Sequence, residues 1–191
     1  MDRNDFGVAG QGWEMMMHTF TDALTLVLKE EGGWVNNPAD PGGMTNLGVT
    51  ARTWASWSGE PASEATMRAL TPEQVTPLYK ADYWDKIAGD QMPAAMALPV
   101  FDFAVNAGPG RSARILQGLV GVAQDGAIGP GTLGALQAHI ASDGLESVIT
   151  DFSNARADYY RALSTFPTFG RGWLARVDRI ETAAIAWADN P

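Results

Sequence analysis

Apolar residues recur at helical spacing over most of this chain, and the pattern predicts a mainly α-helical protein. Phe20, Leu24, Val27 and Glu31 lie at spacings of four, three and four, so at about 100° per residue they share one narrow arc of a helix. The last member of this apolar arc is a glutamate, and the adjacent Glu30 lies only at the edge of the arc. Of the two glutamates, Glu31 is therefore the one we expect to face the protein interior.

Helix-start signals predict further helices downstream. Thr50 suits the N-cap of a short helix, and Thr71, Pro72 and Gln74 occupy the N-cap, first-turn and reciprocal capping positions of the next one. Pro77 lies about one turn inside that helix and should distort its beginning.

The following segment predicts a connector over residues 89–99 and then a buried helix over residues 100–108. Asp102 and Asn106 lie four residues apart on one face of that helix, and buried polar groups require partners. They form either an internal pair that fixes helix packing or a second cleft wall facing Glu31. We favour packing for Asp102 and weigh the two roles equally for Asn106.

Two amphipathic stripes complete the chain, and we assign both to the core: Leu145, Val148, Ile149, Phe152, Tyr159 and Leu163, then Trp173, Val177, Ile180, Ala184 and Trp187.

A polar stretch separates the first two predicted helices. Gly32 and Gly33 end the first helix, and the prolines and glycines of residues 34–50 interrupt regular structure. So long a connector is unusual in a compact domain, and its short polar side chains suit the hydroxyls of a sugar. The stretch is a candidate wall of a carbohydrate cleft, the alternative being a plain turn-rich connector. Its polar residues are Asn36, Asn37, Asp40, Thr45, Asn46 and Thr50.

Glu31, at the end of the first helix, is a candidate general acid. A carboxyl group placed among apolar side chains loses hydration of its charged form and holds its proton more readily. The alternative is a structural role, in which Glu31 caps a sheet or pairs with an arginine.

Composition narrows the possible chemistry. The 191 residues, 46% of them hydrophobic, can bury a core in one domain or in two closely packed lobes. The absence of cysteine excludes disulfides and thiolate metal sites, and His18 and His139 alone make no imidazole cluster, so we expect no metal and no other cofactor. The net charge of −9 and the lack of a basic cluster argue against nucleic acid as a partner. Toward any anionic polymer the net charge is repulsive unless a local basic patch offsets it.

The residues from Glu31 to Thr50 resemble the amino-terminal signature of the glycoside hydrolase family 108 muramidases. They contain Glu-Gly-Gly, then Asn-x-Pro-x-Asp-x-Gly-Gly-x-Thr, then Gly-Val-Thr. The layout is also similar to phage-type lysozymes, and that resemblance implies a catalytic group of Glu31, Asp40 and Thr45, with a slightly different spacing to the threonine.

Later segments extend the resemblance. Phe-Asp-x-x-Val-Asn-x-Gly around Asp102 implies a contribution to the substrate cleft, and Gly-Trp-x-x-Arg ending at Arg176 resembles the closing element of the family. Residues 115–136 are similar to a small helical peptidoglycan-binding motif, or else form a helical packing unit without a ligand. The matching pieces span residues 20–176 and imply one catalytic unit.

These observations predict a mainly α-helical, lysozyme-like fold with a small irregular or β-containing lobe near residues 34–50. We divide the chain into a flexible N-terminal extension (1–16), a catalytic lobe (17–97) and a helical peptidoglycan-binding-like lobe (98–191) packed on it as one unit.

The resemblance implies a muramidase that hydrolyses the β-1,4 bond between N-acetylmuramic acid and N-acetylglucosamine, with Glu31 as general acid. Asp40 would stabilise an oxocarbenium-like state or act with Thr45 to hold a water. Alternatives are a lytic transglycosylase, a non-catalytic wall-binding or phage structural protein, and a chitosanase or chitinase. The candidate substrate-binding residues are Asn37, Asn46, Asn106, Tyr83 and Trp84, the two aromatic ones being packing residues first.

The cellular setting follows from the start of the chain and from hydropathy. Residues 1–7 lack the features of a secretory signal peptide, and no apolar run approaches the ~20 residues needed to span a bilayer. We expect a monomer made in the cytoplasm that acts on peptidoglycan glycan strands in the periplasm or cell wall. It would arrive through a holin or another non-Sec route, as in phage lysis or in bacterial secretion.

Overall fold

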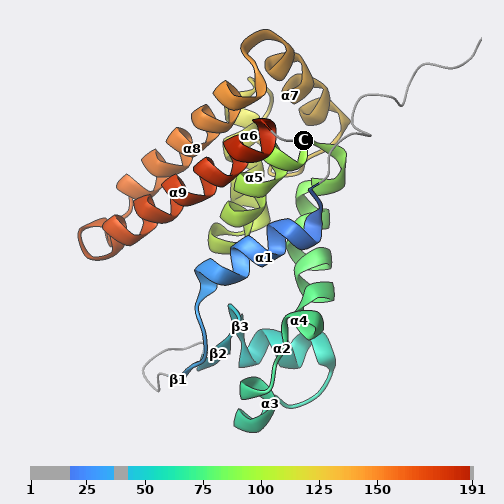
Figure 1. The fold of residues 1–191 in the computed structure, drawn as a ribbon, viewed down its shortest axis with the longest axis vertical. Coiled ribbons are helices and arrows are strands. Elements are labelled where there is room, and N and C mark those ends of the chain that lie inside the picture. Colours follow the sequence, from blue (N-terminus) through green and yellow to red (C-terminus); the bar gives the residue numbers. More distant parts are fainter. Residues whose placement is uncertain (1–17, 37–42, 190–191) are drawn as a thin grey trace, which may run out of the picture.

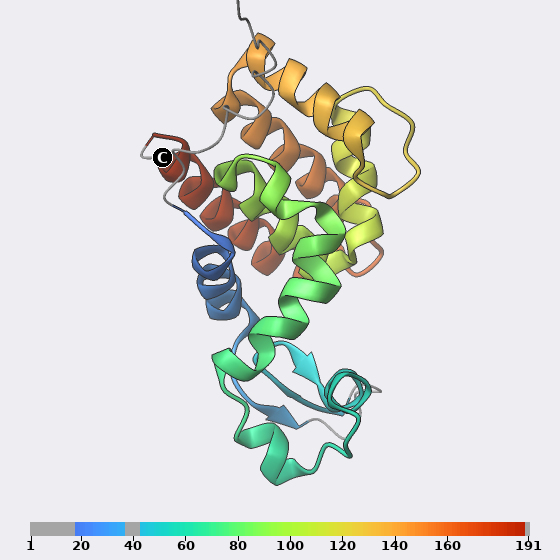
Figure 2. The same ribbon diagram turned by 90° about the vertical axis from the view of Figure 1, so that its right-hand side faces the viewer.

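The fold is that of a computed structural model, which describes residues 18–36 and 43–189. Two lobes lie one above the other and are linked by α1 and by the helical segment that begins with α4 (Figures 1 and 2). The upper, larger lobe is entirely helical over its described residues, and the lower lobe holds a small sheet. The predicted mainly α, lysozyme-like fold with a small β-containing lobe is confirmed.

The small lobe is built on a three-stranded antiparallel sheet in the order β1-β2-β3. Its strands are short: β1 (Val35–Asn36), β2 (Met44–Asn46) and β3 (Val49–Thr50). Leu47 and Gly48 make the tight turn between β2 and β3, with φ of 49° and 72°. The lobe is completed by α2 (Ala51–Ser58) and α3 (Glu64–Arg68). As predicted, Thr50 caps α2, because its hydroxyl accepts a hydrogen bond from the Thr53 amide at 3.1 Å.

The two connecting helices follow the sequence signals. In α1 (Phe20–Glu31), Ala23, Leu24 and Val27 are buried, in agreement with the predicted apolar arc. In α4 (Pro72–Tyr79), the predicted capping box of Thr71 and Gln74 is present. The predicted distortion at the beginning of α4 is wrong, because α4 is α-helical from Pro72 through Pro77 to Tyr79 and the irregular part follows it. The chain continues as a π-helical turn, η1 (Lys80–Trp84), and two 3₁₀ turns, η2 (Asp85–Ile87) and η3 (Gly89–Gln91).

The large lobe is centred on α5 (Ala94–Ala107), which corrects one prediction. The expected connector over residues 89–99 is wrong in its second half, because α5 begins at Ala94 and continues through Pro99. Proline removes one backbone hydrogen bond, but the preceding Ala-Ala-Met-Ala-Leu residues are good helix formers. The helix is also buried from Ala94 to Ala104, so tertiary packing outweighs the local cost.

The remaining helices complete the large lobe. They are α6 (Pro109–Leu119), α7 (Pro130–Asp143), α8 (Leu145–Arg161) and α9 (Phe166–Asp189). α5 contacts α6, α8 and α9 in the large lobe and also α1, whereas α7 packs against α8. Within the described residues, no helix combines the length and the apolar character that a membrane span requires.

Candidate active site

Glu31 is the last residue of α1 and lies where the two lobes meet. Its side chain is 18% exposed, and its Oε1 accepts a hydrogen bond of 2.6 Å from Nη2 of Arg176 in α9. The carboxyl group is thus held at one oxygen while part of it stays open to solvent. For Glu31, pairing with an arginine was the structural alternative to a catalytic role. The structure shows such a pair, so the surroundings of Glu31 decide what the pair can do.

Behind Glu31 lies a buried network of charges. Arg176 donates to both oxygens of Asp102, with Nη2 at 2.6 Å from Oδ1 and Nε at 3.1 Å from Oδ2. Asp102 has no exposed surface, and its Oδ2 also lies 2.5 Å from Nη2 of the buried Arg156 in α8. Two carboxylates and two guanidinium groups therefore balance each other. This arrangement meets the requirement that buried charges be paired, and the predicted structural role of Asp102 agrees with it.

Arg176 carries a fixed positive charge at this position. Burial alone would lower the pKa of its guanidinium, but the carboxylates of Asp102 and Glu31 outweigh that effect and raise the pKa above its ordinary value. Arg176 cannot act as an acid or a base. What it can do is fix the orientation of Glu31.

Glu30 forms a separate pair with Arg179, one turn further along α9. Two hydrogen bonds join them, 2.8 Å from Nε to Oε1 and 2.5 Å from Nη2 to Oε2. The hydrogen bond from Arg179 is the main cause that holds the pKa of Glu30 below its ordinary value. Both oxygens of Glu30 are occupied, whereas Glu31 accepts a hydrogen bond from another described residue at Oε1 alone.

The β2–β3 turn covers Glu31 from the small lobe. A Cβ atom at Gly48 would lie 2.8 Å from Cγ and 3.0 Å from Oε2 of Glu31, and 2.5 Å from the Tyr79 hydroxyl. Only glycine leaves room for this approach, and its φ of 72° is also the conformation that glycine adopts most easily. Tyr79 fixes the turn, because its hydroxyl donates a hydrogen bond of 2.8 Å to the Leu47 carbonyl. Burial, followed by the charge of Glu31, raises the pKa of Tyr79, so it stays protonated.

The two aromatic candidates have different environments. Tyr83 is partly buried and packs against Tyr79 at 5.5 Å between ring centroids. Burial first, then the charges of Asp82 and Glu31, raises its pKa, which places Tyr83 near the site. Trp84 is 2% exposed, packs against Phe20 and Phe101, and donates a hydrogen bond to Asp90. A ring without an exposed face cannot stack on a sugar, so we leave Trp84 out of the candidate site.

The polar candidates are distributed over both lobes. Thr45 is partly buried in β2, opposite Val35 and Thr50 in the sheet. Asn46 is 7% exposed and its amide donates to the Met67 carbonyl at 2.8 Å, so it holds the sheet to α3. Asn106 is exposed at the end of α5, and its amide donates to the Asp102 carbonyl. Asn37 and Asp40 lie outside the described residues, as does the predicted extension 1–16.

Sequence reasoning missed how Glu31 is held. It did not identify Arg176 or Tyr79 as neighbours of Glu31, because they lie 145 and 48 positions away, nor Arg156 as the second partner of Asp102. The available signal was the Gly-Trp-x-x-Arg element that ends at Arg176. This element resembled a family motif, but no role was assigned to Arg176.

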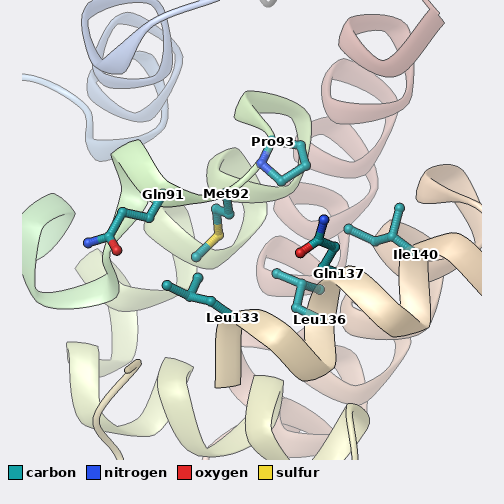
Figure 3. A pocket seen from close by; sticks show the side chains of 7 residues that line it. All are labelled: Gln91, Met92, Pro93, Leu133, Leu136, Gln137 and Ile140. Carbon is teal, nitrogen blue, oxygen red and sulfur yellow. The ribbon is translucent and has the colours of Figure 1, made fainter. Parts of the chain in front are cut away.

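A small cavity elsewhere in the large lobe is not a second site. It measures about 60 Å³ and lies between α7 and the segment that leads into α5 (Figure 3). It has no titratable side chain in its lining, which is Gln91, Met92, Pro93, Leu133, Leu136, Gln137 and Ile140. We interpret it as a packing gap. In the described part of the chain, no group of three or more His, Cys, Asp and Glu side chains could hold a metal ion.

Comparison with known proteins agrees with this geometry. Residues 24–108 match the family model described as glycosyl hydrolase 108, and residues 111–178 match one described as a predicted peptidoglycan domain. The solved structure of Brucella abortus SagA is similar at 41% sequence identity and a TM-score of 0.77, covering 88% of this chain and 95% of SagA. No curated protein matches. This chain therefore belongs to glycoside hydrolase family 108 and is a glycosidase that acts on peptidoglycan.

Proposed function

We propose that the protein is an N-acetylmuramidase that hydrolyses the β-1,4 bond between N-acetylmuramic acid and N-acetylglucosamine, with Glu31 as its general acid. The observation that carries the proposal is the placement of Glu31. Its carboxyl group ends a helix between the lobes, is anchored at one oxygen by Arg176, and stays partly open to solvent. Among the glycines of the described chain, Gly48 is the one at which an added Cβ would meet a carboxyl group, that of Glu31.

In the proposed reaction, Glu31 transfers its proton to the glycosidic oxygen as the bond from the anomeric carbon to that oxygen breaks. The leaving sugar takes the proton and the electron pair of the broken bond, and the remaining sugar becomes oxocarbenium-like. Water then adds its oxygen to the anomeric carbon and passes a proton to a carboxylate of the site, either Asp40 or the deprotonated Glu31. Asp40 is the proposed second carboxylate, which stabilises the charged sugar or acts with Thr45 to hold the water. The separation of the two carboxyl groups sets the stereochemical outcome.

In the proposal, Arg176 supports this role by fixing the orientation of the Glu31 carboxyl group. Its bond to Oε1 fixes the carboxyl plane and leaves Oε2 as the oxygen that faces the β2–β3 turn. Its charge is shared with Asp102, which takes the larger part of its hydrogen bonds. A catalytic group held in one geometry reacts faster than a freely rotating one.

The test compares Glu31→Gln with the matched variant Glu30→Gln on purified peptidoglycan. Loss of a general acid reduces the rate by about 10²–10⁴-fold, so Glu31→Gln should release almost no reducing ends while Glu30→Gln stays near wild type. Equal rates for wild type and Glu31→Gln would refute the acid role. Binding to the wall and the circular dichroism spectrum serve as controls for folding.

Mass spectrometry of the products identifies the bond and the reaction. After borohydride reduction, a muramidase leaves reduced N-acetylmuramic acid at the chain ends. Reduced N-acetylglucosamine would instead show cleavage at the other glycosidic bond. A lytic transglycosylase, the second candidate, forms an anhydro sugar with 18 mass units less than the hydrolysis product and no reducible end. Anhydro products from the wild type would therefore overturn hydrolysis.

A further inference from the structure

One aromatic side chain is left exposed beside the candidate site. Within residues 18–36 and 43–189, only three large apolar side chains are exposed, and Phe169 in α9 is one of them at 53%. A single exposed apolar residue is ordinary on a protein surface. Its position in α9 is what makes this one informative.

Phe169 lies on the same face of α9 as Arg176. Seven residues separate them, which at about 100° per residue brings them back to within about 20° of each other and places them about 10 Å apart along the axis. Trp173 lies between them on the edge of this face. On this face of α9, Arg176 binds Glu31. The same face therefore runs from the contact with Glu31, past Trp173, to Phe169. Figure 1 shows this half of α9 extending above the strands of the small lobe, on the side where α1 ends.

The rings form a fixed surface. Phe169 packs on Trp173 with 5.7 Å between ring centroids, and Trp173 stacks on Tyr160 at 5.2 Å and 28°. The Tyr160 hydroxyl accepts a hydrogen bond of 3.2 Å from Arg156, which is paired with Asp102. The same buried charges that hold Arg176 therefore also hold the aromatic row in place. Because these rings are already ordered, binding of a ligand should cost little side-chain entropy.

We propose that Phe169 and Trp173 form a stacking platform for a sugar ring of the glycan strand, on the large-lobe side of the cleft and about two helical turns from Glu31. The inference rests on the proposed function, because the strand that reaches Glu31 is the strand that passes over the platform. The apolar face of a pyranose ring suits an aromatic surface with polar surroundings. The platform binds and positions the substrate and takes no part in bond cleavage.

The test measures binding in the Glu31→Gln background, so that cleavage does not interfere. Peptide-free glycan strands prepared from peptidoglycan are titrated by calorimetry. Adding Phe169→Ala should weaken binding about 5- to 10-fold. Phe169→Tyr should restore it, and Phe169→Leu, which is apolar but has no ring, should not. The matched control is Trp57→Ala on α2, which removes the other exposed aromatic side chain, at 40% exposure, and should leave binding unchanged.

Several results would overturn the platform. They are unchanged binding in Phe169→Ala, equal binding by the Leu and Tyr variants, or the same loss in Trp57→Ala. If Phe169→Ala instead abolishes self-association in sedimentation experiments while glycan binding persists, the face belongs to a second copy of the chain. Failure of the proposed function is distinct, because it appears as unchanged turnover in Glu31→Gln. Since Phe169 is exposed, its variants should keep the wild-type melting temperature.

Discussion

Glu30 and Glu31 are adjacent in sequence and each binds an arginine of α9, yet the two arginines differ in burial and in their other partners. The side chains of the two glutamates are almost equally exposed, at 16% and 18%. Their partners are not, because Arg179 is 56% exposed and Arg176 only 11%. Arg176 is held in turn by the fully buried Asp102, whereas within residues 18–36 and 43–189 the hydrogen bonds of Arg179 go to Glu30 alone. The depth of the arginine, rather than that of the glutamate, separates a positioned carboxyl group from a surface ion pair.

The largest difference between the two pairs should appear in stability. Asp102→Asn keeps the shape of the side chain but leaves Arg156 and Arg176 without their buried carboxylate, and an uncompensated buried charge costs about 3–5 kcal/mol. Glu30→Gln removes an exposed pair worth about 0.2–1 kcal/mol. Urea denaturation of both variants measures the difference in the free energy of unfolding. Similar losses in the two variants would mean that the buried network adds no more than the surface pair.

The second difference concerns turnover. Arg176→Gln frees the carboxyl group of Glu31 to rotate, and misplacement of a catalytic group by about 1 Å costs up to about 10²-fold, so we expect the rate to fall by at least about 10-fold. Arg179→Gln should change it less than about 2-fold. Rates on peptidoglycan are compared at temperatures at which circular dichroism shows both variants folded. A larger loss in Arg179→Gln would reverse the assignment of the two pairs.

Gly48→Ala tests the small-lobe side of the same site. Alanine at φ of 72° is strained, and its Cβ would overlap the Tyr79 hydroxyl and Glu31 Cγ, so we expect a loss of about 1–3 kcal/mol together with lower turnover. The matched control is Gly59→Ala, which has φ of 75° and no atom within 4 Å of the added Cβ. It should cost about 1 kcal/mol and leave turnover unchanged. Equal turnover in the two variants would show that the close approach to Glu31 has no functional role.

The smallest expected effect is the pH dependence of the Glu30–Arg179 pair. The pKa of Glu30 is lower in the folded protein than its ordinary value of 4.5, so the pair contributes stability above that pH. The contribution is lost as the pH falls through the folded-state pKa. Arg179→Gln should therefore reduce the melting temperature more at pH 7 than at pH 3. Melting curves at the two pH values measure this, and an equal shift at both would show that the pair carries no charge-dependent stability.

Most of the helices could be predicted because their signals are local. The capping box of Thr71 and Gln74 and the apolar arc that ends at Glu31 depend on neighbours within one or two turns. The beginning of α5 was missed because Pro99 is a strong local breaker, and burial against α1, α8 and α9 outweighs it only in the folded protein.

The candidate site divides in the same way. Periodicity favoured Glu31 over Glu30 for burial, but the two side chains are equally exposed, and their partners are what separate them. The contacts of Glu31 with Arg176 and Gly48 join segments that are distant in sequence, and no periodicity encodes such contacts. Trp173 was likewise assigned to the core, because it belongs to a helical stripe. Such a stripe does not reveal where a helix extends beyond its neighbours and leaves an aromatic residue such as Phe169 exposed.

The charge network has a consequence for recombination between relatives. The two family models divide the chain between residues 108 and 111, which suggests a place where modules could be exchanged. The network crosses that point, since Glu31 and Asp102 come from the first part and Arg156 and Arg176 from the second. A chimera joined there would inherit Glu31 from one parent and the arginine that binds it from the other. Compatible parents must therefore match at these four positions.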